Sequence, residues 1–347
     1  MDKSSADVFV YAKASGMLAK SFVGSRVNKL FSVNTIEGLW ELLFQSSAPS
    51  VSESSLVQMI EEKVEQEFLC GFISLLKEYS RPQAFLVELL RFYDYDNLKN
   101  MMPTLVAMGV QGSLPLPARL ASIGKFSLLK YDKWPSLDAM TAGSPVAWCA
   151  DAQGVERQCD IDGRLDAQYV RTLWNSVAKL DSTSKEPVRR LLKDEIIYHN
   201  IIWALRLRIY YGMEPSDILC RLVTSREYRS NEAVARDELA KSAAQILTLP
   251  LDSYREWVNW KYSYLLNPCK DGGRWSLDLR WVQRMARFEL SRRALHQFHH
   301  HPFTSHVLFC WFKVKQYELD CIRMVAEGIR FKVSPAQIKE FSGIRAY

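Results

Sequence analysis

The sequence lacks the features that mark proteins of the membrane interior or of the secretory pathway. No stretch approaches the 18 uninterrupted apolar residues that a membrane-spanning helix needs. The opening residues MDKSSADVFVYAKASG have neither the basic flank nor the apolar core of a signal peptide. Seven cysteines are an odd number, and none forms a CxxC pair. We therefore expect reduced thiols in a cytosolic protein, without a disulfide framework or a zinc ribbon.

Catalytic motifs are equally scarce. The chain has no GxSxG, no phosphate-binding GxxxxGK[ST] and no Cys/His pair at the spacing of a known nucleophile. Asp160-Ile-Asp162-Gly163 lacks the other ligands of a calcium loop, and Lys270-Asp-Gly-Gly-Arg274 follows no strand, so both are predicted to be loops. We expect neither a catalytic residue nor a small-molecule substrate.

One segment does suggest metal binding. Five of the six histidines lie between Leu295 and His306, but HEXXH is absent and no carboxylate stands beside them as a further ligand. We interpret His301-Pro302-Phe303 as a corner between two helices, and we predict no metal and no other cofactor. A helical enzyme that uses the segment His296–His306 is a weaker hypothesis, and metal analysis would test it.

Charge and aromatic content give little reason to expect nucleic-acid binding. The net charge of +6 is small and spread along the chain. The ten tryptophans lie at core spacing on helical faces and form no RNA-binding signature. We predict no nucleic-acid partner.

What the sequence does contain is an internal repeat. Three helices begin near Pro82, Pro187 and Pro302, which are 105 and 115 residues apart. Each carries acids or amides further along: Asp94 and Asn97 in the first, Glu195 and Asn200 in the second, and Glu318 with Arg323 in the third. Repeats of this size decide an architecture. We predict three related helical units at residues 1–115, 116–220 and 221–347.

Apolar periodicity predicts helices almost throughout, because the short alternating runs of strands are rare. Long helices are expected over 52–79, 166–180, 277–297 and 304–331, together with a capped helix over 252–266. The helix that Pro82 opens should end or kink near Met101–Met102, before Pro103. Gly112-Ser-Leu-Pro115, Gly212-Met-Glu-Pro215 and Lys332-Val-Ser-Pro335 are expected to close the three units.

The last long helix carries a polar stripe and one acid on its apolar side. The stripe steps by three and four residues through Lys313, Gln316, Asp320, Arg323, Glu327 and Arg330. Glu318 falls on the opposite side, with Trp311 and Ile322. A carboxylate there needs a partner, and Lys315, one turn earlier, is the nearest candidate. The alternative is a partly exposed glutamate.

The second repeat helix is apolar on nearly all faces from Ile196 to Tyr211, which is typical of a buried helix. Asn200 is then expected to be a buried amide bonded to neighbouring backbone. Arg206 and Arg208 either pair with acids such as Glu195 or reach a surface that meets a partner.

Three segments carry a resemblance to a known family. They are Val10-Tyr11-Ala12-Lys13-Ala14, Asn200-Ile-Ile-Trp-Ala-Leu-Arg-Leu-Arg208 with Tyr210-Tyr211-Gly212, and Lys315 to Arg323 followed by Glu327-Gly328 and Ile338. Together they resemble the central-stalk family of rotary V-type (vacuolar or archaeal-type) ATPases, which comprises the C-type subunit of prokaryotes and the d-type subunit of eukaryotes. Two positions depart from the family pattern: Cys321 stands where asparagine is usual, and Ile197 replaces an acid.

The resemblance implies an all-α protein, with three similar units around a pseudo-threefold axis in a funnel. It implies a non-catalytic rotor part, one copy per complex, that links the central shaft to the membrane ring of proteolipid subunits. The protein would lie on the cytoplasmic face and transmit torque for ATP-coupled proton or sodium transport. Candidate motif or partner-binding residues are Asp94, Asn97, Asn200, Arg206, Arg208, Glu318 and Arg323. The alternative is a soluble helical-repeat scaffold or interaction module unrelated to any rotary ATPase.

Overall fold

Helices are the only regular structure in the computed structural model, which describes residues 1–108, 116–117, 119–152, 156–269 and 274–342. The all-α prediction is therefore confirmed. Seven helices are long: α1 (Lys3–Lys20), α3 (Glu53–Leu76), α4 (Ala84–Met108), α7 (Gln158–Ser176), α8 (Ser182–Tyr211), α13 (Leu279–His300) and α14 (His306–Arg330).

Shorter elements connect them. The short α-helices are α2 (Ile36–Phe44), α5 (Leu137–Thr141), α6 (Trp148–Ala152), α9 (Pro215–Leu219), α10 (Asn231–Arg236), α11 (Lys241–Gln245), α12 (Tyr254–Trp257) and α15 (Pro335–Ser342). The 3-10 segments are η1 (Gly24–Ser32), η2 (Gly124–Phe126), η3 (Tyr131–Lys133), η4 (Val177–Lys179) and η5 (Ser263–Leu265).

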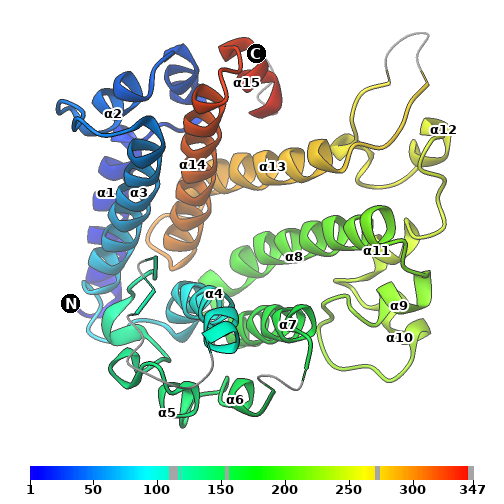
Figure 1. Cartoon of the computed structure of the whole chain (residues 1–347). Coiled ribbons are helices and arrows are strands. Elements are labelled where there is room, and N and C mark those ends of the chain that lie inside the picture. The colour runs from blue at the N-terminus through cyan, green and yellow to red at the C-terminus, as the bar shows by residue number, and fades with distance from the viewer. Residues whose placement is uncertain (109–115, 118, 153–155, 270–273, 343–347) are drawn as a thin grey trace.

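Six of the long helices contact one another in a closed circuit. In Figure 1, α3 and α14 lie side by side, and α8 and α13 run together across the molecule. Helix α4 packs on α7, α7 on α8, and α13 on α14. Helices α3 and α4 are joined by a short loop and meet through the rings of Phe68 and Tyr93, whose centroids are 6.4 Å apart. The order α3, α4, α7, α8, α13, α14 thus returns to its start.

Three apolar cores lie along this circuit, and α4, α7, α8 and α13 each contribute to two of them. The first core contains residues of α1, α3 and α14, the first halves of α4 and α8, and the ends of α7 and α13. The second contains the rest of α8 and the segment from α9 to the first part of α13, and the third contains the rest of α4 with α5, α6 and the start of α7. The cores therefore cross the predicted unit boundaries at 115/116 and 220/221.

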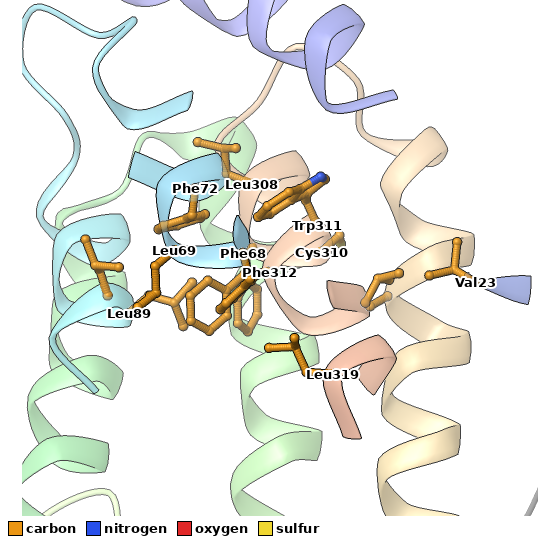
Figure 2. Packing of buried hydrophobic residues seen from close by; sticks show 14 of the residues in the cluster. Val23, Phe68, Leu69, Phe72, Leu89, Leu308, Cys310, Trp311, Phe312 and Leu319 are labelled. Atoms are coloured by element: carbon orange, nitrogen blue, oxygen red, sulfur yellow. The ribbon is translucent and has the colours of Figure 1, made fainter. Parts of the chain in front are cut away.

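Aromatic rings fill the contact between α3 and α14 (Figure 2). Trp311 and Phe312 lie against Phe68 and Phe72, with ring centroids between 4.9 and 6.1 Å apart. Gly71 permits this approach, because a Cβ there would lie 2.9 Å from the Met17 Cε and 3.3 Å from the Trp311 ring. Large rings of this kind contribute most of the burial energy of a core.

Two prolines lie inside helices rather than at their ends, so α4 does not end near Met101–Met102 and α8 does not begin at Pro187. A kink at Pro103 stays a prediction. Helix α4 continues through Pro103 to Met108, because Met101, Met102 and Leu105 are buried in the third core. Helix α8 begins five residues before Pro187, where the Asp181 side chain accepts a hydrogen bond from the Ser184 amide. In both helices tertiary packing and capping outweigh the single backbone bond that proline removes.

Two other segments also differ from expectation. Helix α7 begins at Gln158, so Asp160 to Gly163 is helical rather than a loop. The segment 252–266 was expected to be one helix but forms only the short elements α12 and η5. Its tryptophans Trp257 and Trp260 are buried in the second core. The Trp257 Nε1 donates to the Pro250 carbonyl at 2.7 Å.

Most of the remaining boundaries agree to within a few residues. The predicted helices 52–79, 277–297 and 304–331 are confirmed, as is the closure of α8 at Gly212, whose φ is 58°. Pro335 opens α15 as expected. Gly112-Ser-Leu-Pro115 lies outside the described residues, as does most of Lys270–Arg274.

Gly328 provides a stability test of how α15 docks. A Cβ at Gly328 would lie 2.5 Å from Cδ1 of the buried Ile338, so Gly328→Ala forces Ile338 out of its site. We expect a loss of about 1–3 kcal/mol in the free energy of unfolding. Thermal unfolding and amide exchange over residues 335–339 measure it.

The matched control is Gly163→Ala, in helix α7. A Cβ there has no neighbour within 4 Å, so this change should leave stability equal or raise it by about 0.5–1 kcal/mol. Equal melting temperatures for the two variants would contradict the docking described for Ile338.

Candidate partner-binding cavity

The six helices of the circuit enclose a cavity of about 1140 Å³. Each of α3, α4, α7, α8, α13 and α14 contributes side chains to its wall, as does the segment 119–122. A partner that entered this space would contact all three predicted units at once.

The predicted polar stripe of α14 forms part of this wall. Lys313, Gln316, Asp320 and Arg323 all face the cavity. Three ion pairs connect the stripe with neighbouring helices: Lys313 with Glu195 at 2.6 Å, Arg323 with Glu65 at 3.1 Å, and Asp320 with Arg287 at 3.0 Å. Arg323 is thus at the same time a wall residue and a tie between α14 and α3.

Asp94 and Asn97 of α4 bind the backbone of the segment 121–128, which runs back along the helix. The Asn97 Nδ2 donates to the Ala121 carbonyl at 2.8 Å, and its Oδ1 accepts from the Ala121 amide at 3.0 Å. Asp94 is buried and accepts from the Leu128 amide at 2.6 Å and from the Ser127 hydroxyl at 2.8 Å. Burial raises the pKa of Asp94, and these hydrogen bonds oppose the rise.

Asn200 repeats the arrangement of Asn97 on α8. Its Nδ2 donates to the carbonyls of Val223 at 2.8 Å and Leu239 at 3.0 Å, and its Oδ1 accepts from the Val223 amide at 2.9 Å. Its side chain is completely buried. The prediction of a buried amide bonded to backbone is confirmed, and it rules out direct contact with a partner.

Glu318 of α14 likewise uses a buried polar side chain to hold a distant backbone segment. It is only 3% exposed, accepts from the Phe22 amide at 2.5 Å and forms an ion pair with Lys315. The partnership with Lys315 is confirmed, and the alternative of a partly exposed glutamate is wrong. Cys321, three residues further along, is also buried, and burial raises the pKa of its thiol to about 12.

The sequence interpretation missed Asp237. Ile197 occupies the place on α8 that Asp94 and Glu318 occupy on their helices. Buried Asp237 supplies the missing carboxylate from the loop after α10: it accepts from the Leu239 amide at 2.9 Å and from the Tyr228 hydroxyl at 3.0 Å. The sequence did contain a hint: an apolar residue, Ile197, stands where the other two helices have an acid, so a carboxylate from another segment could have been expected.

Arg206 and Arg208 have different environments, and neither pairs with Glu195. Arg206 lines the cavity with its guanidinium 6.0 Å from the Trp203 ring centre and 3.5 Å from the Gln283 Oε1. Arg208 donates to the Ile246 carbonyl at 2.8 Å and is not part of the cavity wall. Only Arg206 is placed to meet a partner in the cavity.

Because Arg208 binds a backbone carbonyl and Arg206 lines the cavity, reversing the charge of each should affect stability differently. Arg208→Glu removes the donor to Ile246 and places a carboxylate beside its carbonyl, so we expect a loss of about 1–3 kcal/mol in the free energy of unfolding. Arg206→Glu should change stability by less than about 0.5 kcal/mol, because no buried group depends on it. Urea titration measures both, and equal losses would contradict the assignment.

The histidine-rich segment divides into exposed and buried parts. His296 and His300 are exposed with their Nε2 atoms 3.2 Å apart, and the His299 Nδ1 lies 3.0 Å from the Tyr11 hydroxyl. His306 is fully buried. In the described part of the chain no three histidine, cysteine or carboxylate side chains are grouped as metal ligands. Over the same residues no helix has the length and apolarity to cross a membrane.

Comparison with known proteins decides the family. Residues 10–341 match the sequence model of the family described as ATP synthase (C/AC39) subunit. The chain belongs to this family. It is therefore a stalk component of a rotary V-type ATPase or ATP synthase, a structural part of that complex, and the resemblance seen in the sequence is confirmed. A protein of Treponema pallidum (strain Nichols), described as uncharacterized, is 31% identical over 349 residues, which cover 100% of this chain and 99% of that one.

Proposed function

We propose that this chain is the rotor coupler of its ATPase: it connects the central shaft to the proteolipid ring on the cytoplasmic face and passes torque between them. One copy would serve each complex, and the coupled ion would be a proton or sodium. The observation that supports this most is the cavity lined by all six helices of the circuit, which offers a socket for the shaft tip.

The proposed architecture is a funnel with pseudo-threefold symmetry, built from residues 1–115, 116–220 and 221–347. The pairs α3/α4, α7/α8 and α13/α14 follow one another around the cavity. Asn97 and Asn200 bind backbone 24 and 23 residues downstream with the same donor and acceptor pattern. Because the cores cross the unit boundaries, we regard the units as repeats of the chain rather than as separately folding domains.

A torque-transmitting part has to be stiff, and the cavity wall has the ties for this. Lys313 is only 6% exposed where it pairs with Glu195 of α8, and Arg323 pairs with Glu65 of α3. The closely packed aromatic rings between α3 and α14 also resist movement of these two helices relative to each other. A load on one helix of the circuit therefore reaches the others.

Reconstitution tests the proposal. The rotary ATPase is assembled in lipid vesicles with and without this chain, and ion uptake is measured against ATP hydrolysis. We expect the ions moved per ATP to fall close to zero without the chain and to recover when it is added back. Pumping that stays coupled to hydrolysis in its absence would sink the proposal and favour a helical scaffold that only accompanies the complex.

A further inference from the structure

The cavity wall has two parts of different chemistry, one formed by α3 and α4 and the other by α8 and α13. The α3/α4 wall is polar and mainly acidic. Its lining residues include Glu61, Glu62, Glu65, Gln66, Asp96 and Asn100. The α8/α13 wall presents apolar surface from Ile202, Trp203 and Leu290. Of its charged lining residues, Glu195 pairs with Lys313 and Arg287 with Asp320, whereas no carboxylate among the described residues pairs with Arg206.

Several of these charges already have partners. Glu65 pairs with Arg323, and Glu62 lies 3.4 Å from the exposed Arg119. In the part of the chain that the structure describes, Glu61 and Asp96 have no cationic partner. The cavity therefore has an excess of negative charge on the α3/α4 wall.

The α8/α13 wall has an unpaired positive charge instead, at Arg206. No carboxylate among the described residues pairs with Arg206, whose guanidinium lies near the Trp203 ring. Trp and Arg are the side chains most often found as binding anchors at protein interfaces. A charge in a concave cleft acts on a partner more strongly than the same charge on an open surface. The unpaired acids and the unpaired arginine lie on different helices of the wall, so they favour one orientation of a charged partner.

We propose that the cavity selects a helical shaft segment with a matching polarity. One face of that segment, apolar and carrying a carboxylate, lies against Trp203 and Arg206. A second face carries lysine or arginine and lies against Glu61 and Asp96. This inference rests on the proposed function and adds to it the chemistry and orientation of the occupant.

The size and symmetry of the cavity agree with such an occupant. A helix about 10 Å across would place on the order of ten residues in this volume. Three similar units alone would accept the segment in three equivalent orientations. Because the acids without a cationic partner, Glu61 and Asp96, lie on the α3/α4 wall and the unpaired Arg206 lies on the α8/α13 wall, a single orientation satisfies both.

Binding measurements with the purified shaft subunits of the same ATPase test the inference. The cavity variants are Glu61→Lys with Asp96→Lys, and separately Arg206→Glu. The matched controls are Glu67→Lys, which is exposed on α3 outside the cavity, and Arg190→Glu, which lies on the surface of α8. We expect each cavity variant to weaken the Kd about tenfold or more, and each control to stay within about twofold.

Two further readouts need no altered residue. Wild-type affinity should fall as salt rises, because opposite charges are screened. Zero-length coupling of carboxylates to amines should join shaft lysines to Glu61 or Asp96. Cross-links confined to Glu67 and the outer surface would overturn the proposed orientation.

The outcomes separate the two proposals. If wild-type protein does not bind the shaft at all, the proposed function itself fails. If wild-type protein binds and both cavity variants bind within about twofold of it, only the polarity inference fails. A second copy of this chain in the cavity, detected as a dimer by mass photometry, would also overturn it.

Discussion

Asn200→Ala lowers the free energy of unfolding by about 3–5 kcal/mol, the largest single-residue effect that we expect on α8. The amide is fully buried and makes three hydrogen bonds to the backbone of Val223 and Leu239. Alanine leaves those backbone groups buried without partners, and each costs about 1–3 kcal/mol. Urea titration gives the total, and amide exchange should show residues 221–240 opening first.

Three further substitutions make the comparison specific. Asn200→Asp keeps the acceptor for Val223 but loses both donors, so it should also be strongly destabilising. Asn97→Ala should cost less than Asn200→Ala, because Asn97 lines the cavity and water can replace part of its bonding. Asn231→Ala changes an exposed amide and should stay within about 0.5 kcal/mol of wild type. If Asn200→Ala behaves like Asn231→Ala, the amide does not hold the returning chain.

The sequence predicted the long helices well where local and tertiary preferences agree. Helices α3, α13 and α14 have apolar stripes, clear starts and no competing signal. It was wrong where a single residue type was given too much weight. Pro103 did not end α4, because the turn beyond it packs into the third core. The helix expected at 252–266 did not form, because Trp257 and Trp260 pack edge to face at 5.6 Å in an irregular segment.

The candidate site was only partly predictable, for a geometric reason. The stripe on α14 was visible because residues at steps of three and four share one helical face. Its partners Glu65, Glu195 and Arg287 lie on three other helices, and spacing within one helix contains no information about them. The cavity depends on how six helices meet, so its two walls became visible only in the fold.

The stability of the protein should depend on pH through His306, the buried histidine at the start of α14. Its Nε2 lies 3.0 Å from the Gln297 Oε1 and 3.2 Å from the Cys310 Sγ, while its buried Nδ1 has no hydrogen-bond partner among the described residues. Protonation would place an N–H and a positive charge at that Nδ1. Burial, with a smaller contribution from His301, therefore lowers the pKa of His306 from 6.5 to about 3.

The direction of the pH effect follows from the difference between the pKa of His306 in the unfolded and in the folded chain. Below pH 6.5 the unfolded chain binds a proton at this histidine, and the folded chain does not until about pH 3. Stability contributed by the neutral ring is complete above pH 6.5 and is lost as pH falls through this window. The loss is about 1.4 kcal/mol per pH unit, or roughly 3 kcal/mol by pH 4.

Urea titrations between pH 7 and pH 4 measure this slope in wild type and in His306→Gln, which has no ring to protonate. We expect the slope of the variant to be smaller by about 1.4 kcal/mol per pH unit, whatever its stability at pH 7. His296→Gln is the control: this side chain is exposed, so its removal should leave the slope unchanged. Parallel curves for wild type and His306→Gln would show that the buried ring accepts its proton without unfolding, and that Nδ1 finds an acceptor or water in the folded state.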